Sequence, residues 1–273
     1  MRIAILMTCH NRCSKTLRCL DHLFSQNENK FNFDVFLVDD GCTDDTAIEV
    51  KDKYSTVNII KGDGSLFWNR GMLLAWHASM EKVKYDGVLW LNDDTYLEKD
   101  ALTIIYDYAY KFPETIIVGT IASLDDVSII SYGGYLKREY RLVPTDDIQY
   151  CNFFNGNCVF IPRKVSDIVG LLDPYYHHSS GDYDYGCRAN KLGYKAVITP
   201  IVGRCDRNPS YPKWMSTELS VFKRFKILYS PLGNNPFEAF HFCKNNESIL
   251  RGVVVFLYLN CKALFPKLIK SSN

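Results

Sequence analysis

Acidic residues follow two strand-like runs of this sequence, at positions where they could hold a hard divalent cation. Residues 88–91 are an apolar run that stops at 92–94 (Asn-Asp-Asp), and the apolar run 33–38 stops at 39–40 (Asp-Asp). Because the carboxyl ends of parallel strands lie at one edge of a sheet, these side chains should converge in a crevice there. Mg²⁺ or Mn²⁺ typically binds one or two protein carboxylates together with substrate phosphate oxygens. The pattern therefore predicts a phosphate-bearing substrate held through a metal.

The same residues have a simpler explanation as helix caps, because Asp, Asn, Ser and Thr are the preferred N-caps. Thr46 with Glu49, and Thr95 with Glu98, have the spacing of a capping box, and the second pair predicts a helix that runs to Tyr110. Each acidic cluster taken alone leaves the cap and the binding site both open. The agreement between clusters at neighbouring strand ends favours the binding site.

The composition predicts a folded protein without a nucleic-acid partner. The chain has 273 residues, of which 47% are hydrophobic, so it can bury a large core. Its 32 Lys and Arg against 31 Asp and Glu give a formal net charge of +1. No overall field then attracts a long polyanion, whereas a compact anion held by a few local charges fits.

The cysteine pattern predicts reduced thiols in a cytoplasmic protein, which could also act at the inner face of the cell membrane. The ten cysteines contain no CxxC pair, and the chain is too large to depend on disulfides. The apolar start, residues 1–7, is shorter than the core of a signal peptide and predicts a first strand. The apolar stretch 253–259 falls short of the roughly 20 residues that span a bilayer.

Strands alternate with helices through the first 120 residues, which predicts an α/β fold with a doubly wound, mostly parallel, Rossmann-like sheet. The predicted strands are 3–7, 33–38, 57–60 and 88–91, and the predicted helices are 13–24, a helix from 46, 69–83 and 95–110.

The pattern changes in the later part of the chain, where a small antiparallel element is expected at 129–135. Two more strands, 158–161 and 195–198, and two helices, 163–170 and 182–192, follow. We expect one domain over 1–215, with halves 1–120 and 121–215, and a C-terminal helical extension over 216–273 that breaks at 230–236.

Four ordered segments resemble the landmarks of the family 2 inverting glycosyltransferases of GT-A fold. They are 3–12 with the helix after it, 38–44, 91–95 and 180–188. The resemblance covers about residues 1–215. It implies a nucleotide-sugar half and an acceptor half, and transfer of a sugar from a nucleotide-sugar donor to an acceptor hydroxyl with inversion at the anomeric carbon.

The resemblance assigns the donor site to the acidic strand ends. It implies that Asp39 or Asp40 contacts the nucleoside. It also implies that Asp94, with Asp93 as a helper, ligates a divalent cation, Mn²⁺ or Mg²⁺, that bridges the diphosphate. Asn92 stands where the family's DxD motif has its first aspartate, which resembles the Asn-x-Asp-Thr variant of rhamnosyltransferase-like members.

Other positions extend the predicted donor site. Arg12 and Asp63 match places where the family makes further nucleoside contacts. Arg70, at a predicted helix start, is a candidate to offset the charge of the leaving diphosphate. Asp206 and Arg207 match the late position at which the family often places a group that reaches the metal or the diphosphate.

Asp182 matches the catalytic base of the family's Glu-Asp motif, with Gly181 in place of the glutamate. An inverting displacement needs a carboxylate on the acceptor side to take the hydroxyl proton. The helix N-terminus beside Asp182 should keep it ionised and lower its basicity. From the residues alone the simpler explanation is an N-cap, with Asp184 and Arg188 as an i,i+4 ion pair.

The C-terminal segment leaves two interpretations open. Arg251, Lys262 and Lys267 among apolar residues could form an interfacial helix that contacts a membrane and reaches a lipid-linked acceptor. The segment could also pack on the domain and present its lysines to water, which is the interpretation that we favour.

Three function classes follow. The first is a metal-dependent inverting hexosyl- or deoxyhexosyltransferase of bacterial-type surface polysaccharide or lipopolysaccharide synthesis, with a glycan or lipid-linked glycan acceptor. A nucleotidyltransferase should open with a Gly-rich basic loop, and residues 8–14 contain no glycine. A non-catalytic nucleotide-sugar or glycan-binding protein of the same fold is the third class, and Asn92 and Gly181 favour it.

Overall fold

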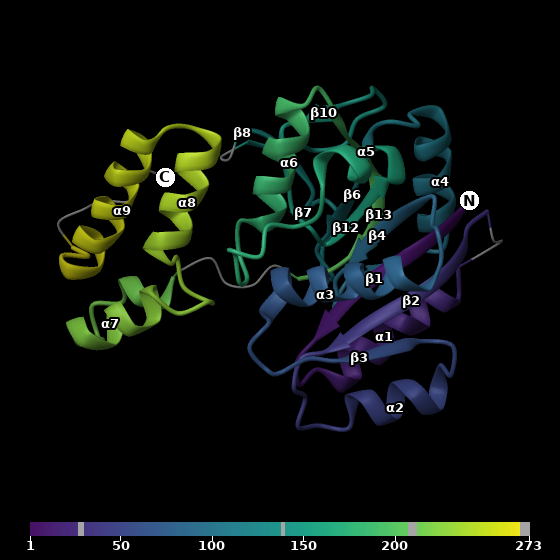
Figure 1. Ribbon diagram of the computed structural model, residues 1–273, viewed down its shortest axis with the longest axis horizontal. Helices are drawn as coiled ribbons and strands as arrows, with labels where there is room; N and C mark the ends of the chain where they lie inside the picture. The colour runs from purple at the N-terminus through teal and green to yellow at the C-terminus, as the bar shows by residue number, and fades with distance from the viewer. Residues whose placement is uncertain (27–29, 138–139, 207–211, 268–273) are drawn as a thin grey trace.

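A central sheet of ten strands organises the protein (Figure 1). The computed structural model describes residues 1–26, 30–137, 140–206 and 212–267. The strand order is β10-β13-β6-β12-β4-β1-β2-β3, with β5 paired to β13 and β7 paired to β6. These strands are β1 Arg2–Cys9, β2 Asn32–Asp39, β3 Asn58–Lys61, β4 Gly87–Leu91, β5 Tyr96–Leu97, β6 Ile116–Ala122, β7 Ile130–Tyr132, β10 Tyr150–Cys151, β12 Cys158–Pro162 and β13 Ala196–Arg204.

Before residue 120, the strands that end in the acidic clusters are paired in parallel. β1 pairs in parallel with β2 and β4, and β2 pairs in parallel with β3. β12 is antiparallel and lies between β4 and β6, while β13 returns parallel to β6. The predicted mostly parallel α/β fold is confirmed. A second, small antiparallel sheet consists of β8 Gly134–Lys137, β9 Tyr140–Arg141 and β11 Phe153–Phe154.

Helices cover both faces of the central sheet. Ile3, Ile5 and Met7 pack in the cluster that contains α1, α2 and α4, whereas Ala4 and Leu6 pack in the cluster that contains α3, α5 and α6. Because successive strand side chains point to opposite faces, a strand buried on both sides is apolar at every position. These helices are α1 Cys13–Phe24, α2 Thr46–Lys53, α3 Phe67–Lys82, α4 Ala101–Lys111, α5 Arg163–Val169 and α6 Gly181–Lys191.

Both predicted capping boxes are wrong. Thr95 is buried and the chain continues from it into β5, so α4 begins only at Ala101. Glu98 forms an ion pair with Arg204 instead, because the pairing of β5 with β13 brings the two side chains together. Thr46 is the first helical residue of α2 rather than its cap. Long-range strand pairing therefore overrides the local capping signal at Thr95.

Three further helices form the C-terminal extension: α7 Val221–Leu228, α8 Pro236–Asn246 and α9 Ile249–Leu264. Figure 1 shows them as a group at the side of the sheet, with α9 on the outer side. The extension is joined to the rest of the chain through α8. His241 Nε2 lies 2.8 Å from an oxygen of Asp173, and the Asn246 amide donates to Asp184 at 2.8 Å. The extension is therefore held against the loop that leads into α6.

The sequence predicts neither membrane-spanning helices nor disulfides. In the described segments no helix is long and apolar enough to cross a membrane. No disulfide joins the cysteines, all ten of which fall within those segments. Burial raises the pKa of the Cys158 thiol to about 12, as expected for a thiol that serves as a small apolar core residue.

Candidate active site

A cleft of about 990 Å³ opens at the carboxyl ends of β1, β2 and β4. This volume is within the usual range for ligand and cofactor sites. The strand ends contribute residues 8–10, 12, 40 and 92–94, and residues 155–157, 178–180, 182 and 183 line the cleft with them. Two residues of the loop between α7 and α8, Leu232 and Asn234, complete the lining. Segments from the whole length of the chain therefore meet at the predicted edge of the sheet.

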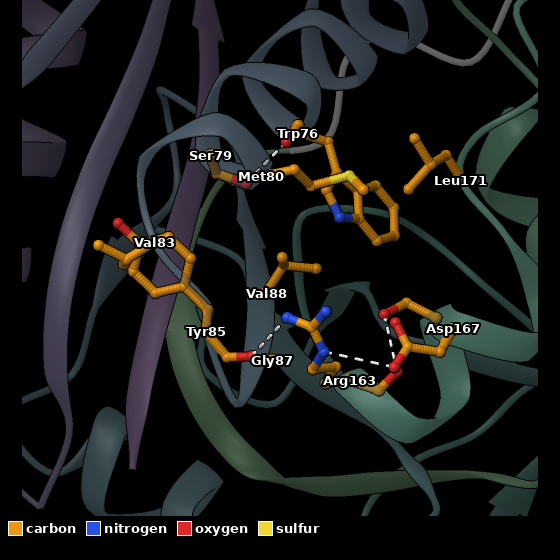
Figure 2. Close-up of a pocket in the computed structure, with 11 residues that line it drawn as sticks. Trp76, Ser79, Met80, Val83, Tyr85, Gly87, Val88, Arg163, Asp167 and Leu171 are labelled. Atoms are coloured by element: carbon orange, nitrogen blue, oxygen red, sulfur yellow. Dashed lines mark hydrogen bonds and ion pairs between the residues drawn. The ribbon is translucent and has the colours of Figure 1, made fainter.

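A second pocket lies at the amino end of β4 and is far smaller. Figure 2 shows Trp76, Met80 and Arg163 around it, with Arg163 in an ion pair with Asp167 at 3.3 Å. Its volume is about 70 Å³, which holds a few water molecules at most. The large cleft is therefore the candidate active site.

Arg12 joins the two acidic side chains after β4. Its Nη1 lies 2.9 Å from Asp94 Oδ2 and 3.3 Å from Asp93 Oδ1. The Thr16 hydroxyl donates to the other oxygen of Asp93. Burial, and then the charge of Asp94, raise the pKa of Asp93 to about 7, although Arg12 acts in the opposite direction. Two adjacent carboxylates thus share one nearby positive charge, and a further cation would stabilise both in the ionised form.

The donor chemistry at Asp93 and Asp94 fits the predicted Mn²⁺ or Mg²⁺. Both ions prefer carboxylate oxygen ligands, and both side chains face the same cleft. A different group of three ligand atoms, from Cys9, Asp39 and Cys42, lies within 4.8 Å in the described part of the chain. Its two thiols suit a soft metal rather than Mg²⁺. The predicted cation therefore fits Asp94 better than this sulfur-containing group.

Asn92 anchors an aromatic wall of the cleft. Trp68 Nε1 donates to Asn92 Oδ1 at 2.7 Å, and the Asn92 backbone N–H donates to the Asn157 carbonyl at 3.0 Å. The Trp68 ring packs on Gly156, where an added Cβ would lie 2.3 Å from the ring. An amide oxygen is sufficient to accept the indole N–H. Asn92 thus has a structural role in the cleft wall, which an aspartate could also fill.

Asp182 lines the same cleft as Asp94, in the first turn of α6. Its Oδ2 accepts from the Gly156 backbone N–H at 2.9 Å and its Oδ1 from the Tyr183 N–H at 2.8 Å. Burial nevertheless raises the pKa of Asp182 to about 6, against the lowering effect of these bonds. The expectation of reduced basicity is wrong, because desolvation outweighs the helix N-terminus. Asp182 is also not the N-cap, which is Ser180.

Gly181 is required by the close approach of α3 and α6. An added Cβ would lie 1.8 Å from Asn69 Oδ1. The Asn69 amide nitrogen donates to the carbonyls of Asp173 and Tyr176, so this side chain is held in place. A glutamate has no room at position 181. The departure at 181 therefore has a packing reason and does not by itself favour a non-catalytic protein.

The acidic turn after β2 mainly stabilises its own loop. Asp40 lines the cleft, but its oxygens accept the backbone N–H groups of Gly64 and Phe67, both at 2.9 Å. Asp39 accepts the Cys42 N–H at 2.8 Å and does not line the cleft. Contact of either carboxylate with a nucleoside stays a prediction.

Three other residues of the predicted donor site do not line the cleft. Asp63 is exposed and bonds the serine two residues after it, and Arg70 Nε donates to a carbonyl in the loop before α6. Asp206 accepts from the Ser123 hydroxyl at 3.2 Å. Arg207 lies outside the described residues. Donor contacts by these four residues also stay predictions.

The sequence analysis missed several residues of the cleft. The segment 155–157 supplies the amide that holds Asp182, and its only local signal is an Asn-Gly-Asn turn before a strand. His178 also lines the cleft. Leu232 and Asn234 carried no signal beyond a Pro- and Gly-containing break between helices.

Comparisons with known proteins identify the family and the fold of the chain. The profile of glycosyl transferase family 2 matches residues 4–163, more than half of the chain. Residues 1–349 of S. aureus TarS superpose with a TM-score of 0.58 at 14% identity, over 98% of this chain and 76% of that chain. A search of curated proteins finds no match.

A second solved structure has the same fold. The mannosyltransferase PcManGT from Pyrobaculum calidifontis, in complex with GDP-Man and Mn²⁺, superposes with a TM-score of 0.57 at 12% identity. The match covers 97% of this chain and 87% of that chain. At this identity the likeness shows the fold alone, and it confirms the predicted GT-A type. The family match and the shared fold together show that the chain belongs to glycosyl transferase family 2.

Proposed function

We propose that the protein is an inverting glycosyltransferase that moves a sugar from a nucleotide-diphosphate sugar to an acceptor hydroxyl. The observation that carries this proposal is that Asp182 and Asp94 line the same cleft. A single displacement needs a base beside the attacking hydroxyl and compensation of charge beside the leaving diphosphate. Asp182 would supply the first, and the Arg12, Asp93 and Asp94 group would organise the second.

Asp182 has the properties of a general base. Its pKa of about 6 leaves it mostly ionised at neutral pH yet close enough to accept a proton. The N–H groups of Gly156 and Tyr183 fix the orientation of its two oxygens. As the acceptor oxygen bonds to the anomeric carbon, its proton becomes acidic and moves to Asp182, while the sugar–phosphate bond breaks and the nucleoside diphosphate leaves.

The proposed cofactor is Mn²⁺ or Mg²⁺, held by Asp94 with Asp93 beside it. When bound, a divalent cation offsets the charge of the diphosphate. The Mn²⁺ in the complex of the Pyrobaculum calidifontis relative supports this choice. Arg12, whose side chain is 41% exposed beside both carboxylates, can add a contact to the diphosphate.

The proposed acceptor is a glycan or lipid-linked glycan in surface polysaccharide or lipopolysaccharide synthesis, at a cytoplasmic location. On the Asp182 side the cleft wall combines hydrogen-bonding groups, His178 and Asn234, with the apolar Leu232. Mixed walls of this kind suit sugar rings, which have apolar faces and polar edges. The Asn-x-Asp-Thr motif supports a hexosyl or deoxyhexosyl, rhamnosyltransferase-like specificity.

An Asp182→Asn variant tests the proposal, with Asp52→Asn, at an exposed position of α2 that does not line the cleft, as the matched control. Donor binding is measured as a thermal shift with UDP-, dTDP-, GDP- and CMP-sugars, each with Mn²⁺ and with EDTA. Turnover is measured as release of nucleoside diphosphate, and NMR of the product gives the anomeric configuration. We expect Asp182→Asn to keep the donor-induced shift and to lose turnover by roughly 100-fold or more.

The control variant should keep both donor binding and turnover. If Asp182→Asn turns over at the wild-type rate, Asp182 is not the base. Retention of configuration in the product would rule out the single displacement. A folded protein that shows no shift with any nucleotide sugar would contradict the transferase itself.

A further inference from the structure

The outward side of α9 is apolar along its whole length. Leu250, Val253, Val254, Leu257 and Leu264 are all exposed, and Leu250 keeps 74% and Leu257 56% of its accessible surface. Their spacing of three, four and seven residues places them on one side of the helix. A continuous exposed apolar face of this size marks an interaction surface rather than scattered surface leucines. We call these five residues the α9 face.

The opposite side of α9 is occupied by its own neighbours. Gly252 leaves no room for a side chain, because an added Cβ would lie 2.9 Å from the Phe240 ring of α8. Lys262 is only 5% exposed, and its amine donates to the Tyr258 hydroxyl at 2.9 Å. The favoured expectation that the tail presents this lysine to water is therefore wrong. The helix is packed through its small residues, and what it presents outward is the α9 face.

The C-terminal extension that carries the α9 face has a positive net charge. Residues 216–273 contain eight Lys and Arg against three Glu and no Asp, a net charge of +5 in a chain whose total is +1. The rest of the chain is accordingly acidic, so the charge is segregated onto the extension. Lys223, Lys226 and Arg251 are exposed on its helices. An apolar helix face flanked by cations is complementary to a bilayer whose headgroups are anionic.

We infer that the α9 face docks on the surface of a lipid bilayer that contains anionic lipids. In the described residues no helix can span a membrane, so α9 would lie in the plane of the interface, with its apolar side chains among the acyl chains. The exposed cations of the extension would contact the headgroups. The docking itself follows from the α9 face and its charge and does not require that the protein be an enzyme.

The same extension also forms part of the cleft, which connects the docking surface to the acceptor. Leu232 and Asn234 line the cleft from the loop between α7 and α8, and α8 packs against α9. Figure 1 places α9 on the outer side of the extension. Resting here on the proposed function, we conclude that a bilayer-bound extension presents the cleft to an acceptor carried by a lipid.

Flotation with vesicles tests the docking. The full chain is mixed with vesicles of phosphatidylcholine alone or of phosphatidylcholine with phosphatidylglycerol. The test variant is Leu250→Glu with Leu257→Glu. The matched control is Ile48→Glu on α2, where the wild-type side chain is 62% exposed. We expect the wild type and the control to float with the anionic vesicles. The double variant should bind these vesicles more weakly, by about tenfold or more.

Wild-type binding should also weaken in high salt and on neutral vesicles. Failure of the wild type to float with anionic vesicles, or equal flotation of the double variant, would overturn the inference. A dimer by light scattering that the double variant abolishes, without vesicle binding, would assign the α9 face to a second copy of the chain. Asp182→Asn should float like the wild type, so a failure of docking is distinguishable from a failure of catalysis.

Discussion

The backbone N–H of Gly156 donates to Oδ2 of Asp182 at 2.9 Å, and the ring of Trp68 packs against the same glycine. Trp68 in turn donates to Asn92, next to the acidic pair after β4. The proposed base and the proposed cation ligands are therefore positioned through one continuous set of contacts across the cleft. Since an added Cβ at 156 would collide with the indole, only glycine allows both contacts at once.

The raised pKa of Asp182 predicts the acid side of the pH profile. With a pKa of about 6, the carboxylate of Asp182 becomes protonated as the pH falls through 6. We expect kcat/KM to fall about tenfold for each pH unit below that point and to level off above it. The measurement is kcat/KM against pH at saturating cation, which keeps Asp93 ionised. A rate that stays constant down to about pH 4.5 would show that Asp182 does not act as the base.

The raised pKa of Asp93 predicts that its removal changes how stability depends on pH. Its pKa is about 7 in the folded protein against roughly 4 for an unfolded aspartate. Between these values the unfolded chain has released a proton that the folded chain keeps. The contribution of Asp93 to the free energy of unfolding is therefore present at low pH and is lost as the pH rises through about 7.

The isosteric Asp93→Asn variant tests this linkage by thermal unfolding in EDTA. We expect the difference in melting temperature, variant minus wild type, to increase as the pH rises from about 5 to 8. Mn²⁺ should then stabilise the wild type more than the variant, because the ion pairs with the carboxylate. Asp52→Asn, at an exposed position of α2 that does not line the cleft, is the matched control. Parallel curves for Asp93→Asn and the wild type would contradict the raised pKa.

Much of the fold was predictable because its signals are local. The apolar run at β1 and the helical spacing of Cys13–Phe24 each identify an element by its own side chains. The cap predicted at Thr95 failed because the pairing of Tyr96 with Arg204, more than a hundred residues away, decides the backbone there. Local propensity gives way where such long-range contacts are made.

The residues of the candidate site were predictable where they belong to the ordered motifs of the family. Arg12, Asp93, Asp94 and Asp182 were predicted from their motifs, and the structure brings them to one cleft. The amide of Gly156 and the loop of Leu232 were not, because neither has a side-chain signature of binding. Their role depends on which distant segments pack together, and the sequence pattern does not encode that locally.

The contact between α3 and α6 predicts that Gly181 tolerates no side chain. In Gly181→Ala the new Cβ would lie 1.8 Å from Asn69 Oδ1, so the Asn69 side chain must leave its two hydrogen bonds or the helices must separate. We expect a loss of about 1–3 kcal/mol in the free energy of unfolding, measured with urea. Combining it with Asn69→Ala should cost less than the two single changes added together, because the collision is removed. Additive losses would place the strain elsewhere.

The hydrogen bond between Glu238 and His177 predicts that the C-terminal extension positions the loop before Asp182. Glu238, on α8, is 7% exposed and lies 2.6 Å from His177 Nδ1. The His177 carbonyl accepts from the Asn69 N–H at 2.9 Å, so the loop before Asp182 is held from two sides. We expect Glu238→Ala to lower turnover about tenfold, because a loosened loop misplaces Asp182.

Donor binding separates this positioning role from general destabilisation. Neither Glu238 nor His177 lines the cleft, so the donor-induced thermal shift of Glu238→Ala should match that of the wild type. Glu238→Gln keeps an acceptor for the imidazole and should recover most of the turnover, and Glu247→Ala at an exposed position of α8's end should have no effect. If Glu238→Ala keeps full turnover, the extension does not act through His177. If turnover and donor binding fall together, its role is to maintain the fold rather than to position the base.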